Sequence, residues 1–361
     1  MTHSPQNNSL QTITEDLTQQ LTCQRRNRIA RIVGSTGFFA VVAFACYLVL
    51  LGQGTVKMSP AEVLDVLRGG GTARQIAVVW DLRLPVALAT MIVGAALGTA
   101  GAWTQTMARN PLASPDILGV TSGAAVLVVL GTVTVRPTWL EDLPMFWWRA
   151  GLAMVGAVAV LVVLTLLGGV GTSDKIVLIG FALSLMLQAV VSYLLLKAEI
   201  LRAAETQTWL AGSTGFVRMN ALIPLLVGLA PFIAIGLWCA RDLPVLAHDD
   251  SSASSLGVNI KARRAALLIA ATGVAAVVVS VVGPIGFIAL IAPHLGRIVA
   301  NTGTPSPMVS AAAGAALLGV CAVIAGFIPT SAPVGAVSSV IGGIALVGLV
   351  IKKMNKRGNN G

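Results

Sequence analysis

The sequence carries very little charge for its length. Only 11% of its 361 residues are Asp, Glu, Lys or Arg, whereas an ordinary soluble domain has about a quarter. So few charges cannot keep a large surface hydrated, which argues against a soluble enzyme. The polar tracts are also too short for a disordered chain. Four cysteines are too few for a disulfide scaffold, and no two of them have the spacing of metal ligands, so we expect no metal site.

The sequence instead contains many long apolar runs. Apolar residues make up 56% of the sequence, and the mean hydropathy is +0.86. About 20 apolar residues carry a helix across a membrane. The runs predict an all-α polytopic membrane protein with about ten transmembrane helices, at residues 32–52, 86–107, 117–135, 150–167, 176–196, 221–239, two within 264–295, 308–327 and 334–351. Gly283-Pro284-Ile285-Gly286 supplies the break between the two helices within 264–295.

Basic residues predict the orientation of these helices, because cytoplasmic segments retain an excess of Lys and Arg. With both termini in the cytoplasm, 15 of the 24 basic residues lie on the cytoplasmic side. We therefore expect a mobile polar cytoplasmic tail at residues 1–31, a transmembrane domain at 32–351 and a basic cytoplasmic tail at 352–361. An anionic inner leaflet accounts for the net charge of +10, so the expected partner is the lipid bilayer and not a nucleic acid.

The polar residues inside the predicted spans bear on what drives the protein. No Asp or Glu lies near the middle of a span, which argues against an ion-coupled secondary transporter, because such carriers bind their ion at that depth. Gln188 is the most central polar side chain; it lines a pathway or forms a hydrogen bond between helices. An intramembrane enzyme would need a nucleophile and a base, and the only candidate base, His294, lies near a span end.

The sequence contains no nucleotide-binding loop. Gly168-Gly169-Val170-Gly171 is rich in glycine, but the Lys and the hydroxyl of a phosphate-binding loop do not follow it. We therefore expect no enzyme in this chain, and a membrane component that depends on a separate motor.

Two predicted cytoplasmic loops have distinct sequences. Residues 109–115 hold two prolines and read as a stiff turn. The longest inner loop spans residues 241–264, where Asp249 or Ser251 could cap a short helix that ends at Gly257. A soluble partner would grip such a surface helix. Elsewhere, small residues such as Gly94, Gly98 and Gly101 recur at a spacing that predicts tight packing between helices.

Short motifs follow one another along the chain at residues 80–85, 93–98, 109–113, 118–124, 209–213, 256–258, 283–294 with Arg297, and 333–335. Together, in this order, they closely resemble the FecCD family of ABC-importer permeases over residues 58–353. The resemblance implies a type II ABC importer permease fold, in a multi-pass subunit of the cytoplasmic (inner) membrane.

The resemblance also implies partners and cargo. A second permease subunit would complete the pathway, with a heterodimer favoured over a homodimer. Two cytoplasmic ABC ATPase subunits would hydrolyse ATP, so this chain would bind no cofactor itself, and an extracytoplasmic binding protein would deliver the cargo. Ferric siderophores are the cargo that the overall similarity favours, and haem and vitamin B12 are the alternatives.

The resemblance assigns roles to particular residues. Contact with the ATPase falls on Asp249, Asp250, Ser252, Ala253, Leu256, Gly257 and Val258. Docking of the binding protein falls on Arg83, although Val86 replaces the second arginine of the family pattern. His294 and Arg297 match a Pro-His-x-x-Arg element at an inner helix end, and a structural hydrogen bond or gating is the expected role of His294.

Overall fold

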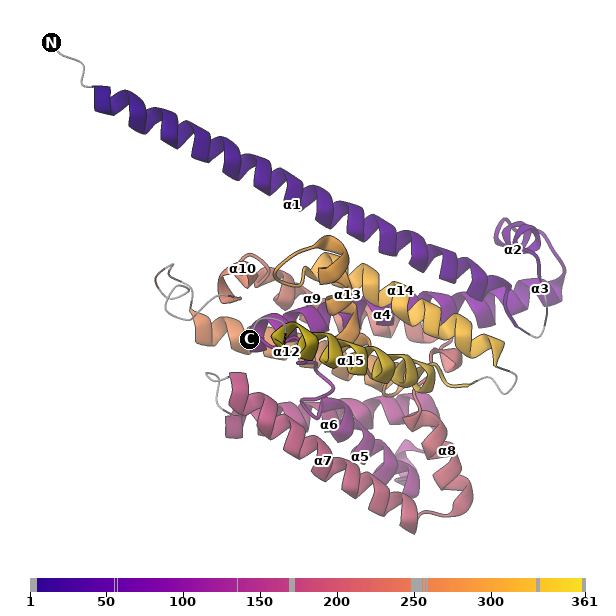
Figure 1. Cartoon of the computed structure of the whole chain (residues 1–361). Helices are drawn as coiled ribbons and strands as arrows, with labels where there is room; N and C mark the ends of the chain where they lie inside the picture. The colour runs from indigo at the N-terminus through magenta and orange to yellow at the C-terminus, as the bar shows by residue number, and fades with distance from the viewer. Residues whose placement is uncertain are drawn as a thin grey trace.

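The computed structural model describes residues 5–54, 56, 58–134, 136–168, 173–247, 255, 257, 259–328 and 332–358, and these residues form helices and no strand (Figure 1). The predicted all-α fold is confirmed. Each predicted span meets a helix: α1 (Pro5–Gly52), α4 (Leu84–Ala108), α5 (Val120–Val133), α6 (Met145–Gly168), α7 (Ser173–Lys197), α9 (Met219–Trp238), α12 (Ile260–Val282), α13 (Ile288–Ala300), α14 (Pro307–Phe327) and α15 (Val334–Gly358). Within the described ranges, seven helices could cross a membrane by length and composition, and α5, α13 and residues 334–348 of α15 are shorter apolar helices.

Helices α4 and α12 form the centre of the bundle. In α12, 78% of the most apolar 18-residue stretch is buried. Trp103 in α4 is fully buried. Helix α4 lies against α14, where a Cβ atom added to Gly94 would come within 2.5 Å of the Gly314 carbonyl oxygen. This confirms the tight packing predicted from the spacing of small residues, because only glycine lets the two backbones approach so closely.

The remaining helices surround this centre. Figure 1 shows α1 running alongside α14 and then continuing past the other helices, while α5, α6 and α7 form a separate layer that contacts the centre through α12. In α7 only 11% of the most apolar 18-residue stretch is buried. Most of the apolar surface of α7 therefore remains uncovered by this chain.

The bundle has two ends that differ in character, named here after one arginine at each. The Arg109 end carries the C-termini of α4, α9 and α13 and the N-termini of α12 and α14. The Arg83 end carries the C-termini of α1 and α12, the N-termini of α4, α6 and α9, and three short helices, α2 (Pro60–Leu67), α3 (Ala73–Ala77) and α8 (Ile200–Leu210). The backbone between α3 and α4 continues as a π-helix over Val78–Arg83.

The N-terminal segment, expected to be a mobile tail, is helical in its described part. The chain is helical from Pro5, so most of the segment 1–31 that we expected to be mobile continues α1. No Gly or Pro occurs between Gln6 and Val33, and Gln and Arg favour helix, so nothing in the sequence ends the helix there. For the same reason α15 continues to Gly358, through most of the predicted basic tail.

Candidate functional site

The turn after α4 is the first part of the candidate site at the Arg109 end. Arg109 ends the helix in the left-handed conformation, with φ 47°. The Asn110 side chain then accepts a hydrogen bond from the amide of Leu112 at 3.0 Å, and the Asn110 carbonyl accepts one from the amide of Ala113. These bonds and Pro111 hold the segment as the stiff turn that the sequence predicts.

Asp116 follows this turn, just before α5. Its Oδ1 accepts a hydrogen bond from the Thr121 hydroxyl at 3.0 Å. Its Oδ2 has no hydrogen-bond partner among the described residues. Burial raises the pKa of the Asp116 carboxyl to about 6, although the Thr121 hydroxyl acts in the opposite direction. The carboxyl therefore keeps its proton to a higher pH than an exposed aspartic acid does.

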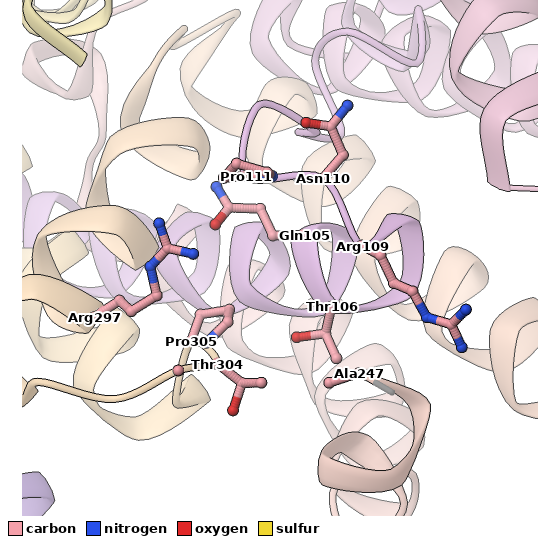
Figure 2. Close-up of a pocket in the computed structure, with 10 residues that line it drawn as sticks. Gln105, Thr106, Arg109, Asn110, Pro111, Ala247, Arg297, Thr304 and Pro305 are labelled. Carbon is pink, nitrogen blue, oxygen red and sulfur yellow. The ribbon is translucent and has the colours of Figure 1, made fainter. Parts of the chain in front are cut away.

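A cavity of about 140 Å³ opens beside the turn (Figure 2). Its wall combines three stretches that are distant in sequence: the last turn of α4 with the turn that follows it, Ala247, and α13 with the loop at 303–305. Figure 2 shows the side chains of Arg297 and Gln105 pointing toward each other, whereas the Arg109 side chain points away. The Gln105 amide nitrogen donates to the Leu290 carbonyl at 2.9 Å, which ties α4 to α13.

Arg109 ties the turn to the segment that precedes the long loop. Its Nε donates to the Leu246 carbonyl at 3.0 Å, at the end of the short helix α10 (Leu243–Leu246). On the far side of the loop, the Asn259 side chain caps α12 by accepting from the Ala262 amide at 3.1 Å. Both ends of the loop are thus fixed to the bundle.

Most residues predicted to contact an ATPase lie outside the described residues: Asp249, Asp250, Ser252, Ala253, Leu256 and Val258. Gly257 is described and is exposed, with φ +78° and no atom within 4 Å of an added Cβ. Its conformation suits the helix C-terminus that the sequence predicts there.

The structure brings His294 and Arg297 together. Their Nδ1 and Nη2 atoms lie 3.2 Å apart on α13, and Arg297 also lines the cavity. Gln188 is exposed on α7, of which little is covered by the described part of this chain. Its two open roles, lining a pathway or forming a hydrogen bond between helices, stay predictions.

Arg83 does not occupy the exposed position that docking requires. It is only 7% exposed. Its guanidinium donates to the carbonyls of Leu51 at 2.9 Å and Gly52 at 3.2 Å, and also contacts the Val56 carbonyl. These carbonyls lie at and beyond the C-terminus of α1, where helix carbonyls lack partners of their own. Arg83 therefore fixes the end of α1.

The Arg83 end also contains a pair that the sequence analysis missed. Arg149 of α6 and Glu205 of α8 form an ion pair at 2.6 Å, beside a cavity of about 430 Å³ that also contacts Trp209 and Phe216. The two partners are 56 residues apart. No local pattern links them, so the pair could not be predicted from the sequence.

A family model gives this geometry its context. The model of the FecCD transport family matches residues 41–352. The chain belongs to this family. The resemblance that the motifs indicated is therefore confirmed, and the match covers most of the FecCD chain described here.

Three relatives illustrate the range of the FecCD family. The ferric enterobactin transport system permease protein FepG of Escherichia coli (strain K12) is 33% identical over 316 residues, covering 85% of this chain and 92% of the relative. The Fe(3+) dicitrate transport system permease protein FecC of the same organism is 33% identical, covering 87% and 95%. The hemin transport system permease protein HmuU of Yersinia pestis is 30% identical, covering 86% and 94%.

A solved structure shows the same fold. A metal-chelate type ABC transporter in an inward-facing conformation superposes with a TM-score of 0.72 at 23% identity, covering 89% of this chain and 99% of that one. The type II ABC importer permease fold expected from the motifs is thereby supported along nearly the whole chain.

Proposed function

We propose that the chain is the permease subunit of an ATP-driven importer that moves a ferric siderophore across the cytoplasmic membrane. The observation that carries this proposal is the family match over residues 41–352, together with relatives named as permeases for ferric enterobactin and ferric dicitrate. A relative named for hemin transport makes haem the second candidate cargo.

In this proposal the Arg109 end faces the cytoplasm and meets the ATPase. The basic residues at this end support the orientation, because cytoplasmic segments retain Lys and Arg. The loop from Ala247 to Asn259 is anchored at both ends, by Arg109 and by the cap of α12. Movement of an ATPase surface against this loop would therefore reach α4 and α12, the centre of the bundle.

A second permease subunit would cover the uncovered face of α7. Its exposed side chains include Phe181, Leu185 and Tyr193, which are 51%, 53% and 59% exposed, with Gln188 among them. In a pathway between two such faces, a large iron chelate would make only weak contacts with any single side chain. The binding protein would select the cargo, and ATP binding by the two ATPase subunits would drive alternating access.

Uptake of radiolabelled iron tests the proposal. Cells with and without the gene are given ferric siderophores, haem or labelled cobalamin. We expect the deletion to abolish ferric-siderophore uptake alone. Loss of haem or cobalamin uptake with normal siderophore uptake would overturn the cargo, and normal uptake of all three would overturn the function.

Two glycine variants test the contact with the ATPase. Gly257→Arg should reduce uptake more than about tenfold while the permease still reaches the membrane, because a Cβ at Gly257 meets no atom within 4 Å. Gly69→Arg is the matched control: Gly69 also has a positive φ, +94°, and open space, but lies at the Arg83 end. Equal uptake by both variants would contradict the proposed contact.

A further inference from the structure

A second cavity lies at the Arg109 end, between α1 and the rest of the bundle. Its volume is about 170 Å³, far more than a single water needs. Arg28 and Ile32 of α1 form one wall, and Leu243, Thr304 and Ser306 are among the residues of the opposite walls. The cavity therefore combines one guanidinium, several hydroxyl groups and an apolar lining.

The charge at this cavity is unbalanced. Arg25, Arg26 and Arg28 are exposed, and none of them has a hydrogen bond or ion pair with the other residues that the structure describes. No Asp or Glu occurs from Leu17 to Ala61. The nearest described carboxylate in sequence to the opposite wall, Asp242, is already paired with Arg263 at 2.7 Å. An anion at Arg28 would thus meet positive charge with no competing carboxylate from these segments.

The cavity lies at the level where the chain meets the membrane boundary. The apolar span of α1 starts at Ile32, and Val33 is 58% exposed on its outer side. Trp238, at the end of α9 and two residues before the cavity residue Ala240, is 66% exposed, and the Arg263 guanidinium lies 3.9 Å from its ring centroid. Exposed tryptophan at a helix end is typical of the headgroup region of a bilayer.

One wall of this cavity lies outside the part of the chain that matches the family model. The family model begins at residue 41, so the wall formed by α1 lies outside the matched region. Arg31, one turn after Arg28, donates to the Asn301 carbonyl at 3.3 Å and holds α1 against the loop before α14. This contact keeps the two walls of the cavity together.

We propose that this cavity binds the phosphate headgroup of an anionic phospholipid. Arg28 contacts the phosphate, the hydroxyl groups of the 302–306 loop complete its hydrogen bonds, and the acyl chains follow the apolar outer face of α1 beyond Ile32. Basic pockets between helices at the cytoplasmic boundary suit such headgroups. The bound lipid would fix the polar extension of α1 to the bundle. This inference goes beyond the proposed transport function and does not depend on the cargo.

Native mass spectrometry of the purified full chain tests the site. The protein is titrated with dioleoyl phosphatidylglycerol and, separately, with dioleoyl phosphatidylcholine. Arg28→Gln should weaken the tightest phosphatidylglycerol binding about fivefold, which equals the loss of about 1 kcal/mol per basic residue at an anionic surface, and leave phosphatidylcholine unchanged. Ser306→Ala, on the opposite wall, should weaken the same binding by a smaller factor.

Arg26→Gln is the matched control, because Arg26 lies on the same exposed helix but does not line the cavity. A change below about twofold is expected. Equal weakening by Arg26→Gln and Arg28→Gln would show diffuse attraction and overturn the site. No effect of Ser306→Ala would place the lipid on α1 alone and also overturn it.

Two further measurements distinguish other possible occupants of the cavity. Inorganic phosphate alone should not raise the thermal stability of the detergent-solubilised protein; stabilisation that depends on Arg28 would indicate a free-phosphate site instead of a lipid site. Co-purification of the ATPase should not depend on Arg28. If Arg28→Gln lost the ATPase and kept its phosphatidylglycerol binding, the surface would belong to that protein partner and the proposal would fail. None of these arms measures transport, so failure of the proposed function would be seen separately.

Discussion

The two ends of the bundle are held together in different ways. The Arg83 end has backbone-to-backbone ties in addition to the side-chain ties of Arg83 and of Arg149 with Glu205: the Ser213 amide donates to the Val282 carbonyl at 2.8 Å, and the Gly335 amide donates to the Gly212 carbonyl at 2.9 Å. At the Arg109 end, the links described above are made by side chains, from Arg109 to the Leu246 carbonyl and from Gln105 to the Leu290 carbonyl. Backbone contacts cannot rearrange without moving whole helices, whereas side chains can.

This difference fits an importer that is driven from one end. Cavities lie at both ends, but only the Arg109 end carries the loop that we propose contacts the ATPase. The Arg83 end brings the loops before α9 and after α12 against the start of α15. Substitutions that disrupt the contacts of one end at a time test this comparison, beginning with the largest expected effect.

The largest effect is expected at the backbone junction. Gly212 has φ +67°, and an added Cβ would collide with the Pro284 carbonyl oxygen. Gly212→Val should destabilise the protein by about 4 kcal/mol or more, because left-handed strain and a backbone clash add. The measurement is the yield of folded protein and its thermal unfolding in detergent.

Gly215→Ala is the matched control in the same loop. Its added Cβ would meet only the Ser213 hydroxyl, at 3.2 Å. We expect a change of about 0.5 kcal/mol or less. Similar unfolding temperatures for the two variants would show that the junction is not a rigid tie.

Arg83 gives the next largest effect. Arg83→Gln removes the guanidinium from three carbonyls at and beyond the end of α1 and should cost about 3 kcal/mol, since charged hydrogen bonds in a buried site are strong and the carbonyls lose their partner. Faster hydrogen exchange of the last turn of α1 would report it. Arg83→Lys should lie between wild type and Arg83→Gln, and a neutral effect of Arg83→Gln would contradict the role of this residue in fixing the end of α1.

Asp116 should make stability depend on pH at the Arg109 end. Its folded pKa of about 6 lies above the value of about 3.9 for an unfolded Asp. The folded state therefore binds the proton more tightly, and stability falls as pH rises from about 4 to about 6, by roughly 3 kcal/mol, then levels off. Asp116→Asn should remove this slope in thermal unfolding followed across pH.

Thr121→Val sharpens the same prediction. The Thr121 hydroxyl donates to the ionised carboxylate at 3.0 Å and lowers its pKa, so its removal should move the slope to higher pH. A pH profile that is identical in wild type, Asp116→Asn and Thr121→Val would contradict the buried carboxyl.

The smallest effect on stability is expected for Arg109. Arg109→Gln removes the bond to the Leu246 carbonyl, and the loss of that bond should cost about 1 kcal/mol. Uptake should nevertheless fall several-fold, because this bond links α4 to the segment entering the loop. Arg241→Gln, an exposed change next to α10, is the control. Full uptake by Arg109→Gln would mean that the loop acts on the bundle by another route.

Local patterns account for most of what the sequence predicted. A helix that crosses a membrane needs one continuous apolar run, and the break at Gly283 and Pro284 needs only neighbouring residues, so both were readable. The role of Arg83 was not, because its carbonyl partner at Leu51 lies 32 residues away. The same applies to Arg149 and Glu205. The helical start at Pro5 was missed because polarity was taken to mean mobility, although no residue there ends a helix.

Transport in proteoliposomes tests the central claim most directly. The permease is reconstituted with its ATPase and binding protein, and uptake of a radiolabelled ferric siderophore is measured with ATP inside the vesicles, with and without ionophores that collapse proton and sodium gradients. We predict uptake that requires ATP and survives the ionophores. Uptake that proceeds without ATP and stops when the gradients collapse would identify an ion-coupled carrier and contradict the account.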